Sequence, residues 1–277
     1  ILMTGELWFR VPEIIEVRLD GEAQKGVYPK DVILEVLGRI RADGAVYKAI
    51  DFTGSYVEKL NVAGRMTICN MAVEMGAKTA YMQPNADVLN YVDKRAVRPY
   101  EVQFTDPDFQ YEESYVFDVS KIEPNLACPS SVENVHPLSE VVATGPIKLN
   151  QGYIGSCTGG RVEDIAIAAK ILKGRHIPEY TRLIVVPASN EVMQECMKAG
   201  YIQDLMNAGA TITTPGCGAC LGAHEGILAP GEVCITSTNR NFPGRMGSTE
   251  ALMYLASPAT VAASMVNGCI TDPRDFL

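Results

Sequence analysis

The stretch GYIGSCTGGRVEDIAIAAKIL, residues 152–172, begins as an apolar strand-like segment, passes through a glycine-rich turn and ends with apolar residues at helical spacing. The same order returns further on, where RLIVVPAS (182–189) precedes EVMQECMKAG (191–200) and EVCITST (232–238) follows as another strand. Strands that alternate with helix-length segments are typical of parallel sheets covered by helices on both faces. The second half of the chain therefore predicts an α/β/α domain.

The first half repeats this alternation. Apolar spacing predicts helices over 30–40, 65–77 and 86–94, and β-rich runs predict strands over 45–52 and 79–83. Between residues 100 and 145 the sequence becomes acidic, aromatic and broken by proline, and its DPDFQYEE run (106–113) is interpreted as a solvated loop. We place a domain boundary in this region and predict two α/β/α domains with largely parallel sheets, residues 1–125 and 126–277.

Composition restricts the classes of function. A chain of 277 residues, 47% of them hydrophobic, is long enough for two domains, and no apolar run of about 18 residues predicts a membrane span. The N-terminal residues lack the basic and apolar segments of a signal peptide, so we expect a cytoplasmic protein whose eight cysteines are reduced. A formal charge of -9 argues against nucleic-acid binding, which needs lysine and arginine against phosphates.

Three loops that follow predicted strands carry unusual residues. GSCTGGRVED (155–164) holds Cys157, PGCGACLG (215–222) holds Cys217 and Cys220 after a strand at 210–214, and NRNFPGR (239–245) follows the strand at 232–238. Ligands of parallel α/β folds bind at the carboxyl ends of the strands, so we expect these loops to form the functional site. A thiol near a helix N-terminus, such as Cys157, is biased towards the thiolate that binds metal.

Three thiolates suit a metal centre better than a disulfide, because any pair would leave one sulfur over. One interpretation is a zinc site of the three cysteines and His224. The other is an iron–sulfur cluster, which the glycine-rich loops favour because bare backbone can approach a bulky cluster and donate N–H groups to it. Spacing alone leaves both interpretations open.

Four motifs together carry a family resemblance: MTICNMAVEMGA (66–77), GSCTGGRVED, PGCGACLG and STNRNFPGR (237–245). With them the chain resembles the aconitase superfamily, most closely the large subunits of 3-isopropylmalate dehydratase and homoaconitase, over nearly its whole length. The resemblance implies a 4Fe-4S cluster held by Cys157, Cys217 and Cys220, with one iron open to substrate. It also implies a hydro-lyase that isomerises a hydroxy di- or tricarboxylate by dehydration and rehydration. A 3-isopropylmalate dehydratase is favoured, and homoaconitase or another substituted-malate hydro-lyase is the alternative.

The same resemblance implies roles for other residues. Arg240 and Arg245 correspond to arginines that bind substrate carboxylates, a task that suits the guanidinium fork. Asn239 is expected to lie against the cluster. Asn70 and Glu74 are four residues apart in a predicted helix and so share a face. The resemblance implies that this face lies towards the cluster and that Glu74 helps to handle the departing hydroxyl. Without the resemblance that face would be interpreted as solvated.

The resemblance also sets expectations about partners. The family's swivelling domain and N-terminal domain have no counterpart in this chain. We therefore expect a small subunit as partner, no turnover by the chain alone, and turnover with the small subunit only when the N-terminal domain is also present. Gly159 stands where the family often has asparagine. Functions of another class, a structural zinc protein or an RNA-binding protein, are the alternatives, and no membrane association is expected. The remaining cysteines and histidines are interpreted as structural: Cys69, Cys128, Cys196, Cys234, Cys269, His136 and His176.

Overall fold

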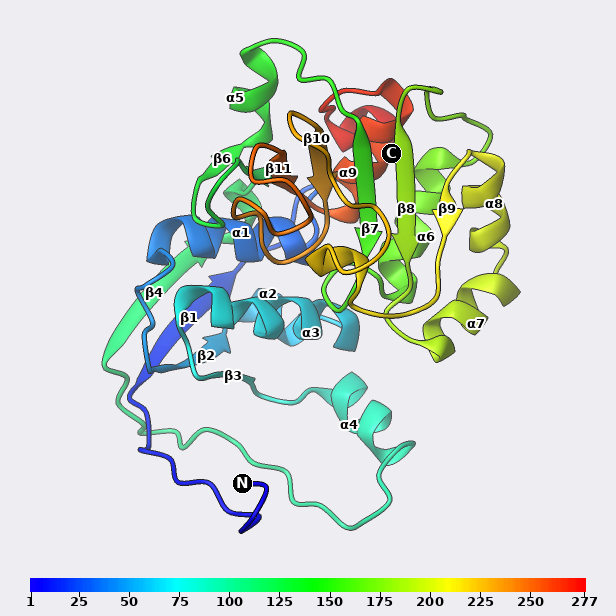
Figure 1. Cartoon of the computed structure of the whole chain (residues 1–277). Coiled ribbons are helices and arrows are strands. Elements are labelled where there is room, and N and C mark those ends of the chain that lie inside the picture. The colour runs from blue at the N-terminus through cyan, green and yellow to red at the C-terminus, as the bar shows by residue number, and fades with distance from the viewer.

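The computed structural model describes residues 1–277, the side chain of Ala219 excepted. Within these residues the first sheet has four parallel strands in the order β3-β2-β1-β4: β1 (Ile14–Asp20), β2 (Ala49–Thr53), β3 (Thr79–Met82) and β4 (Glu113–Asp118). The helices beside it are α1 (Pro29–Ile40), α2 (Ser55–Lys59), α3 (Val62–Met71) and α4 (Ala86–Asp93). Helices α1, α2 and α3 lie over one face of this sheet (Figure 1).

The other face of the first sheet meets irregular chain. Ile50 and Phe52 of β2 belong to the core under α1, whereas Asp51 between them points the opposite way. Its carboxylate accepts hydrogen bonds from the hydroxyls of Thr105 at 2.9 Å and Tyr111 at 2.7 Å. These bonds hold the segment between α4 and β4 against the sheet.

The second sheet is larger and follows the order β6-β5-β11-β10-β7-β8-β9. Its parallel strands are β7 (Gln151–Gly155), β8 (Arg182–Val186), β9 (Thr211–Ile212), β10 (Val233–Thr236) and β11 (Leu252–Leu255). The antiparallel edge consists of β5 (Asn125–Ala127) and β6 (Val135–Pro137). The helices are α5 (Leu138–Ala143), α6 (Val162–Leu172), α7 (Asn190–Lys198), α8 (Tyr201–Asn207) and α9 (Pro258–Asn267).

Helix α9 packs closely on the second sheet because Gly152 of β7 has no side chain. A Cβ atom at Gly152 would lie 2.5 Å from the sulfur of Met265 in α9. The helix itself begins at Ser257, whose hydroxyl accepts from the amide of Thr260, and Pro258 occupies its first turn. On the opposite face of the sheet, Tyr153 of β7 is covered by the long loops between β9 and β11. Those loops contain two of the predicted ligand cysteines.

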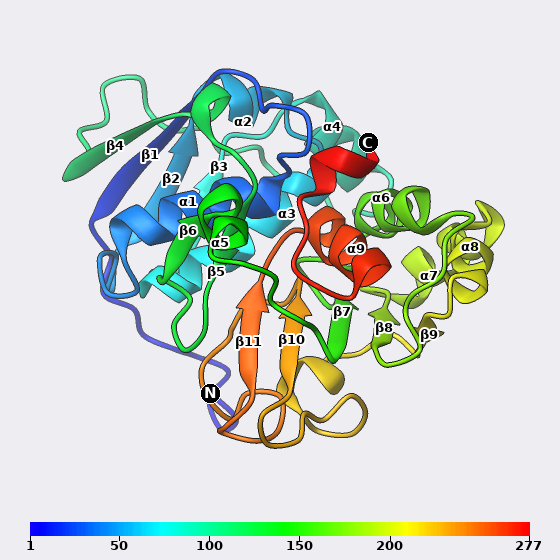
Figure 2. The same cartoon turned by 90° about the horizontal axis from the view of Figure 1, so that it is seen from above.

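The two sheets meet through the start of α1, which lies between the first sheet and the β5–β6 edge of the second (Figure 2). The buried carboxylate of Asp31 in α1 accepts from the amides of Tyr28 at 2.8 Å and Asn125 at 3.0 Å. The first bond caps the helix, and the second ties it to β5. Asp31 therefore stabilises both the helix and the contact between the sheets.

Burial makes Asp31 a source of pH-dependent stability. Desolvation raises its pKa from 3.8 to about 7, and burial raises the pKa of Asp164 in α6 in the same direction. Between about pH 4 and pH 7 the folded chain then holds protons that the unfolded chain has released, so its free energy of unfolding falls as the pH rises through that window. We expect Asp31→Asn, which stays neutral, to flatten this slope in urea denaturation, with a change on the order of a few kcal/mol across the window. The exposed Asp108→Asn is the control, and equal slopes in both variants would contradict the assignment.

Most predicted elements agree with the structure, and the exceptions have physical reasons. The helix predicted over 65–77 is α-helical only to Met71, and then tightens into a 3-10 turn, η1 (Ala72–Met75), before Gly76 with a left-handed φ of 85°. Asn70 and Glu74 therefore do not share one α-helical face. Several elements were not predicted from the sequence: β1, β4, β5, β6, β11, α2, α5, α8 and α9. Of these, β4 is an edge strand with mostly exposed side chains, so its composition resembles the loop before it. Other short helices are η2 (Val119–Lys121), η3 (Ala219–Leu221) and η4 (Pro273–Phe276).

The chain passes from one sheet to the other between Asp118, the last residue of β4, and Asn125, the first residue of β5. A division into domains of residues 1–125 and 126–277 remains a prediction, because Ala127 and Leu255 of the second sheet also pack into the core of the first. Among the described residues, no helix has both the length and the apolar character needed to cross a bilayer.

Candidate active site

Cys157 lies just beyond the carboxyl end of β7. The turn that exposes it is tightly packed, because a Cβ atom at Gly155 would lie 2.4 Å from the carbonyl oxygen of Val186. The next residue, Ser156, has a left-handed φ of 67°, a conformation that costs a non-glycine residue about 1 kcal/mol. This turn leaves the thiol of Cys157 exposed at the edge where the parallel strands end.

Two asparagines from the two sheet-bearing parts of the chain meet beside this thiol. Asn239 lies just after β10. Its side-chain amide nitrogen donates to the side-chain oxygen of Asn70 in α3 at 2.6 Å and lies 3.9 Å from the sulfur of Cys157. The sulfur of Cys157 is 3.8 Å from the same oxygen of Asn70. Thr158 completes the group with a short hydrogen bond from its hydroxyl to the amide oxygen of Asn239. Three residues predicted for the site are therefore in contact.

Glu74 and Arg240 form an ion pair between the same two parts of the chain. The Nε atom of Arg240 lies 2.9 Å from each carboxylate oxygen of Glu74. The carboxylate is nearly buried, with 8% of its side chain exposed, whereas 40% of the Arg240 side chain is exposed. Although Asn70 and Glu74 do not share an α-helical face, both contact the loop that begins at Asn239. The guanidinium is thus anchored at its base and exposed at its tip.

Cys217 and Cys220 lie in the long loop that covers the second sheet. Cys217 is exposed, whereas Cys220 is buried in an apolar cluster above Tyr153. A terminal nitrogen of Arg245 lies 3.8 Å from the sulfur of Cys220, and the guanidinium stacks 5.8 Å above the ring of Phe242. Arg245 is therefore placed against a predicted ligand and not against Arg240.

The three predicted ligand thiols lie within electrostatic range of one another. Burial raises the pKa of Cys217, and the thiolates of Cys220 and Cys157 raise it further. Tyr153 has its pKa raised by burial and then by the negative charges of Cys220, Cys217, Glu225 and Cys157. Its buried hydroxyl has no hydrogen-bond partner among the described residues. The thiols thus surround one region above β7.

His224, the ligand considered for zinc, is held in the same loop by Gly218. A Cβ atom at Gly218 would lie only 1.6 Å from its Nε2 atom, so glycine is required there. The Nδ1 atom accepts from the amide of Glu225 at 2.8 Å. Among the described residues, no group of three or more His, Cys, Asp and Glu side chains is placed to hold a single metal ion.

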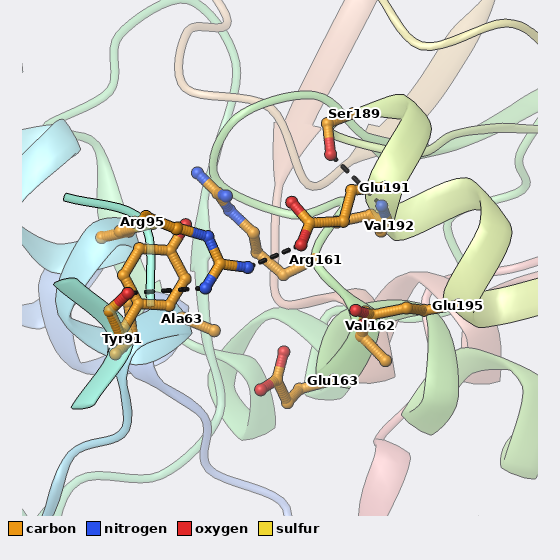
Figure 3. Close-up of a pocket in the computed structure, with 12 residues that line it drawn as sticks. Ala63, Tyr91, Arg95, Arg161, Val162, Glu163, Ser189, Glu191, Val192 and Glu195 are labelled. Atoms are coloured by element: carbon orange, nitrogen blue, oxygen red, sulfur yellow. Dashed lines mark hydrogen bonds and ion pairs between the residues drawn. The ribbon is translucent and has the colours of Figure 1, made fainter. Parts of the chain in front are cut away.

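A cavity of about 430 Å³ lies where the chain around the first sheet meets the chain around the second (Figure 3). It is lined by Arg95 from the first part and by Arg161 and Glu191 from the second. Arg95 is already engaged there, because it pairs with Glu191 at 2.6 Å and stacks 3.9 Å from the ring of Tyr91. A second cavity of about 490 Å³ is lined by Asn70 and also by Arg161. Arg161 therefore borders both cavities, and Asn70 borders the second.

Comparison with protein-family models matches residues 1–268 to the aconitase family, described as aconitate hydratase. The chain belongs to the aconitase family. The resemblance seen in the four motifs is thus confirmed, and so is the mixed α/β fold with parallel sheets flanked by helices.

Curated relatives match this aconitase-family chain along its length. The 3-isopropylmalate dehydratase large subunit 1 of Methanopyrus kandleri is 51% identical over 100% of this chain and 66% of its own length. The probable methanogen homoaconitase large subunit of Methanothermobacter thermautotrophicus is 48% identical over 99% of this chain and 63% of its own. The 3-isopropylmalate dehydratase large subunit of Hydrogenobaculum sp. is 46% identical over 99% of this chain and 64% of its own length. The chain therefore spans about two thirds of the length of these relatives.

The cysteines of this aconitase-family chain suit an iron–sulfur cluster. Cys157, Cys217 and Cys220 are free thiols gathered over β7, and each ligand of a cubane cluster binds a different iron. The ligands need not converge on one point, as they must around zinc. The unpartnered hydroxyl of Tyr153 and the terminal nitrogen of Arg245 beside Cys220 are donors in the same region. The donor set thus fits the cluster that the family implies.

Gly159, where asparagine was the expected family residue, is required by packing. A Cβ atom there would lie 2.2 Å from the hydroxyl oxygen of Ser237 and 2.8 Å from its carbonyl oxygen. We expect Gly159→Ala to lower the free energy of unfolding by about 1–3 kcal/mol, measured by urea denaturation. The matched control is Gly216→Ala, where the nearest atom is 3.9 Å from the added carbon and the change should stay within about 0.5 kcal/mol. If both variants lose the same free energy of unfolding, the contact between the added carbon and Ser237 does not destabilise the protein.

Sequence analysis missed two residues that contact the predicted site, Thr158 and Lys30. Thr158 lies inside the GSCTGGRVED motif but was given no role. Lys30 was interpreted only as part of a helix, although a signal was available: it stands in the first turn of α1, where the helix macrodipole disfavours a cation. A lysine in such a place needs a compensating contact, and the carbonyl oxygens of Ser237 and Thr238 provide it.

Proposed function

We propose that this chain belongs to the large subunit of an iron–sulfur hydro-lyase that isomerises a hydroxy di- or tricarboxylate by removing and returning water. The activity we favour is that of a 3-isopropylmalate dehydratase, and that of a homoaconitase is the alternative, since curated relatives of both names match the chain at similar identity. The cofactor of the proposal is a 4Fe-4S cluster on Cys157, Cys217 and Cys220. When bound, such a cluster supplies a Lewis-acidic iron that polarises a hydroxyl and a carboxylate.

The observation that carries the proposal is the contact between Asn70, Cys157 and Asn239. It joins a helix of the first domain to the ends of two strands of the second, with atoms 2.6–3.9 Å apart. Amide side chains placed beside a ligand thiol can orient both the ligand and a bound hydroxy acid by hydrogen bonding. The three residues come from separate segments of the sequence, and their polar side chains meet at an exposed edge.

The charged residues supply the remaining functions. Arg240 presents an exposed guanidinium tip whose base is fixed by Glu74, and this geometry suits two parallel hydrogen bonds to a substrate carboxylate. Arg245 provides a second cation beside Cys220. The nearly buried carboxylate of Glu74 is the group proposed to exchange a proton with the departing hydroxyl. The arginines also overcome the repulsion that a chain of charge -9 exerts on a multiply charged anion.

The proposed partner is a small subunit that covers this edge and completes the binding site. Each relative described above carries the words large subunit in its name. Cys157, Cys217 and the tip of Arg240 are exposed in this chain. A site that removes water from its substrate must exclude bulk solvent, so a cover over these side chains is required.

The test begins with the chain purified without oxygen and reconstituted with iron and sulfide. Iron and acid-labile sulfide near cluster stoichiometry support the cofactor, and zinc without sulfide rejects it. The holoenzyme, assembled from a full-length large subunit that contains this chain and from the small subunit, is then assayed with 3-isopropylmalate, homoaconitate and citrate. Dehydration or hydration of one of these supports the hydro-lyase, and a cluster-loaded holoenzyme that neither dehydrates nor hydrates any of them rejects it.

A further inference from the structure

Lys30 is a cation buried between the two domains. Only 1% of its surface is exposed, although it lies in the first turn of α1. Its ammonium donates to the carbonyl oxygens of Ser237 at 3.0 Å and Thr238 at 2.6 Å, and to the hydroxyl of Thr158 at 3.4 Å. All three acceptors are in the second domain, so a helix of one domain holds two loops of the other.

These two loops carry the predicted site. Ser237 and Thr238 immediately precede Asn239, and Thr158 immediately follows Cys157. The hydroxyl of Thr158 also bonds to the side chain of Asn239, so the ammonium lies at the centre of a small hydrogen-bond network. Moving Lys30 would release both the ligand loop and the asparagine loop.

The charge of Lys30 requires compensation that its hydrogen bonds do not supply. Its three acceptors are neutral oxygens, and a buried cation without a negative neighbour costs several kcal/mol. Burial lowers the pKa of Lys30 to about 8, and the negative charges that oppose this shift are those of Cys157 and Cys220, followed by Asp164 and Glu74. The cysteines of the predicted site are therefore its main source of compensating charge.

We propose that Lys30 is a positioning residue of the cysteine centre, which holds the loops of Cys157 and Asn239 and provides the fixed positive charge that offsets the thiolate ligands. The electrostatic part rests on the proposed function, because it acts on a cluster bound by those thiolates. A cluster becomes more negative when it is reduced, and a buried ammonium favours that state. Lys30 should therefore raise the reduction potential of the cluster and strengthen the hold on iron.

The experiment compares the parent chain with three variants. Lys30→Met removes the charge and the three hydrogen bonds while nearly keeping the volume, and Lys30→Arg restores a charge. Lys170→Met removes an exposed lysine of α6 and is the control for net charge. Each chain is reconstituted without oxygen, and the midpoint potential of the cluster and the rate of iron loss to a chelator are measured. Hydrogen exchange of the cluster-free chains follows the amides of residues 157–160 and 237–240.

We expect Lys30→Met to shift the midpoint potential to a more negative value and to weaken iron retention by about 10- to 100-fold, the range found for residues that support metal ligands. The amides of residues 237–240 should exchange faster in its cluster-free form. Lys30→Arg should recover most of the potential, and Lys170→Met should match the parent. A purely structural role would lower cluster content in Lys30→Met but leave the potential of the remaining clusters unchanged.

The possible results distinguish a failure of the Lys30 proposal from a failure of the proposed function on which it rests. A parent chain that takes up no cluster rejects the proposed function and the electrostatic part, and hydrogen exchange alone then decides the positioning part. A parent with a cluster and a Lys30→Met variant of equal potential and iron retention rejects the inference while leaving the function intact. If Lys30→Met does not fold, Lys30→Gln, which is also uncharged, takes its place in the same comparison. A midpoint potential of Lys30→Gln equal to that of the parent then rejects the electrostatic part.

Discussion

Replacement of Cys157 by serine is expected to remove most of the iron and acid-labile sulfide that the chain binds after reconstitution. A serine hydroxyl is a far weaker ligand for iron than a thiolate, and the exposed turn before Cys157 offers no neighbouring thiol that could replace it. The turnover of the holoenzyme should fall by at least about 100-fold, since even residues that only support metal ligands cost 10- to 100-fold. Metal and sulfide analysis of the purified variant measures the first effect.

Cys269→Ser is the matched control, because Cys269 is also a free thiol but lies outside the three site loops. It should retain the iron, the sulfide and the turnover of the parent. Full iron and sulfide content in Cys157→Ser would exclude this thiol as a ligand, and the cluster assignment would then need another third ligand. A loss confined to turnover would instead place Cys157 near the substrate.

Replacement of Glu74 by glutamine is expected to lower kcat of the holoenzyme by about 10²–10⁴, the usual contribution of a positioned acid–base group. The amide keeps the size of the side chain but cannot take up or release the proton that accompanies the departing hydroxyl. The nearly buried carboxylate also anchors Arg240 through two contacts of 2.9 Å. Steady-state kinetics with the identified substrate measure both effects.

The division between kcat and KM distinguishes the two roles of Glu74. A variant with a large rise in KM and little change in kcat would show that Glu74 only orients Arg240 for carboxylate binding, which contradicts the acid–base role. Glu140→Gln, an exposed carboxylate of α5, controls for loss of one negative charge and should match the parent. Thermal unfolding of Glu74→Gln is needed as well, because Arg240 loses its partner.

Local sequence was sufficient for the elements that carry the site. The apolar spacing of residues 162–172 and the glycine-rich turn before them predict the strand–turn–helix unit that exposes Cys157, and α6 begins at Val162 as expected. Local patterns failed where long-range contacts decide the conformation. The stretch after Met71 has helical spacing, yet it tightens into a 3-10 turn that ends at Gly76, and β4 is stabilised by pairing with β1 and not by its own composition.

The sequence by itself determined the family, the strand-end loops and the residue types proposed for the chemistry, because these depend on motifs and on short-range periodicity. Tertiary structure alone decided which of those residues touch. It paired Glu74 with Arg240, placed Asn70 against Asn239, and brought the buried ammonium of Lys30 to the carbonyl oxygen of Thr238. Each of these contacts joins residues more than 100 positions apart, so it depends on how the chain around the first sheet packs against the chain around the second.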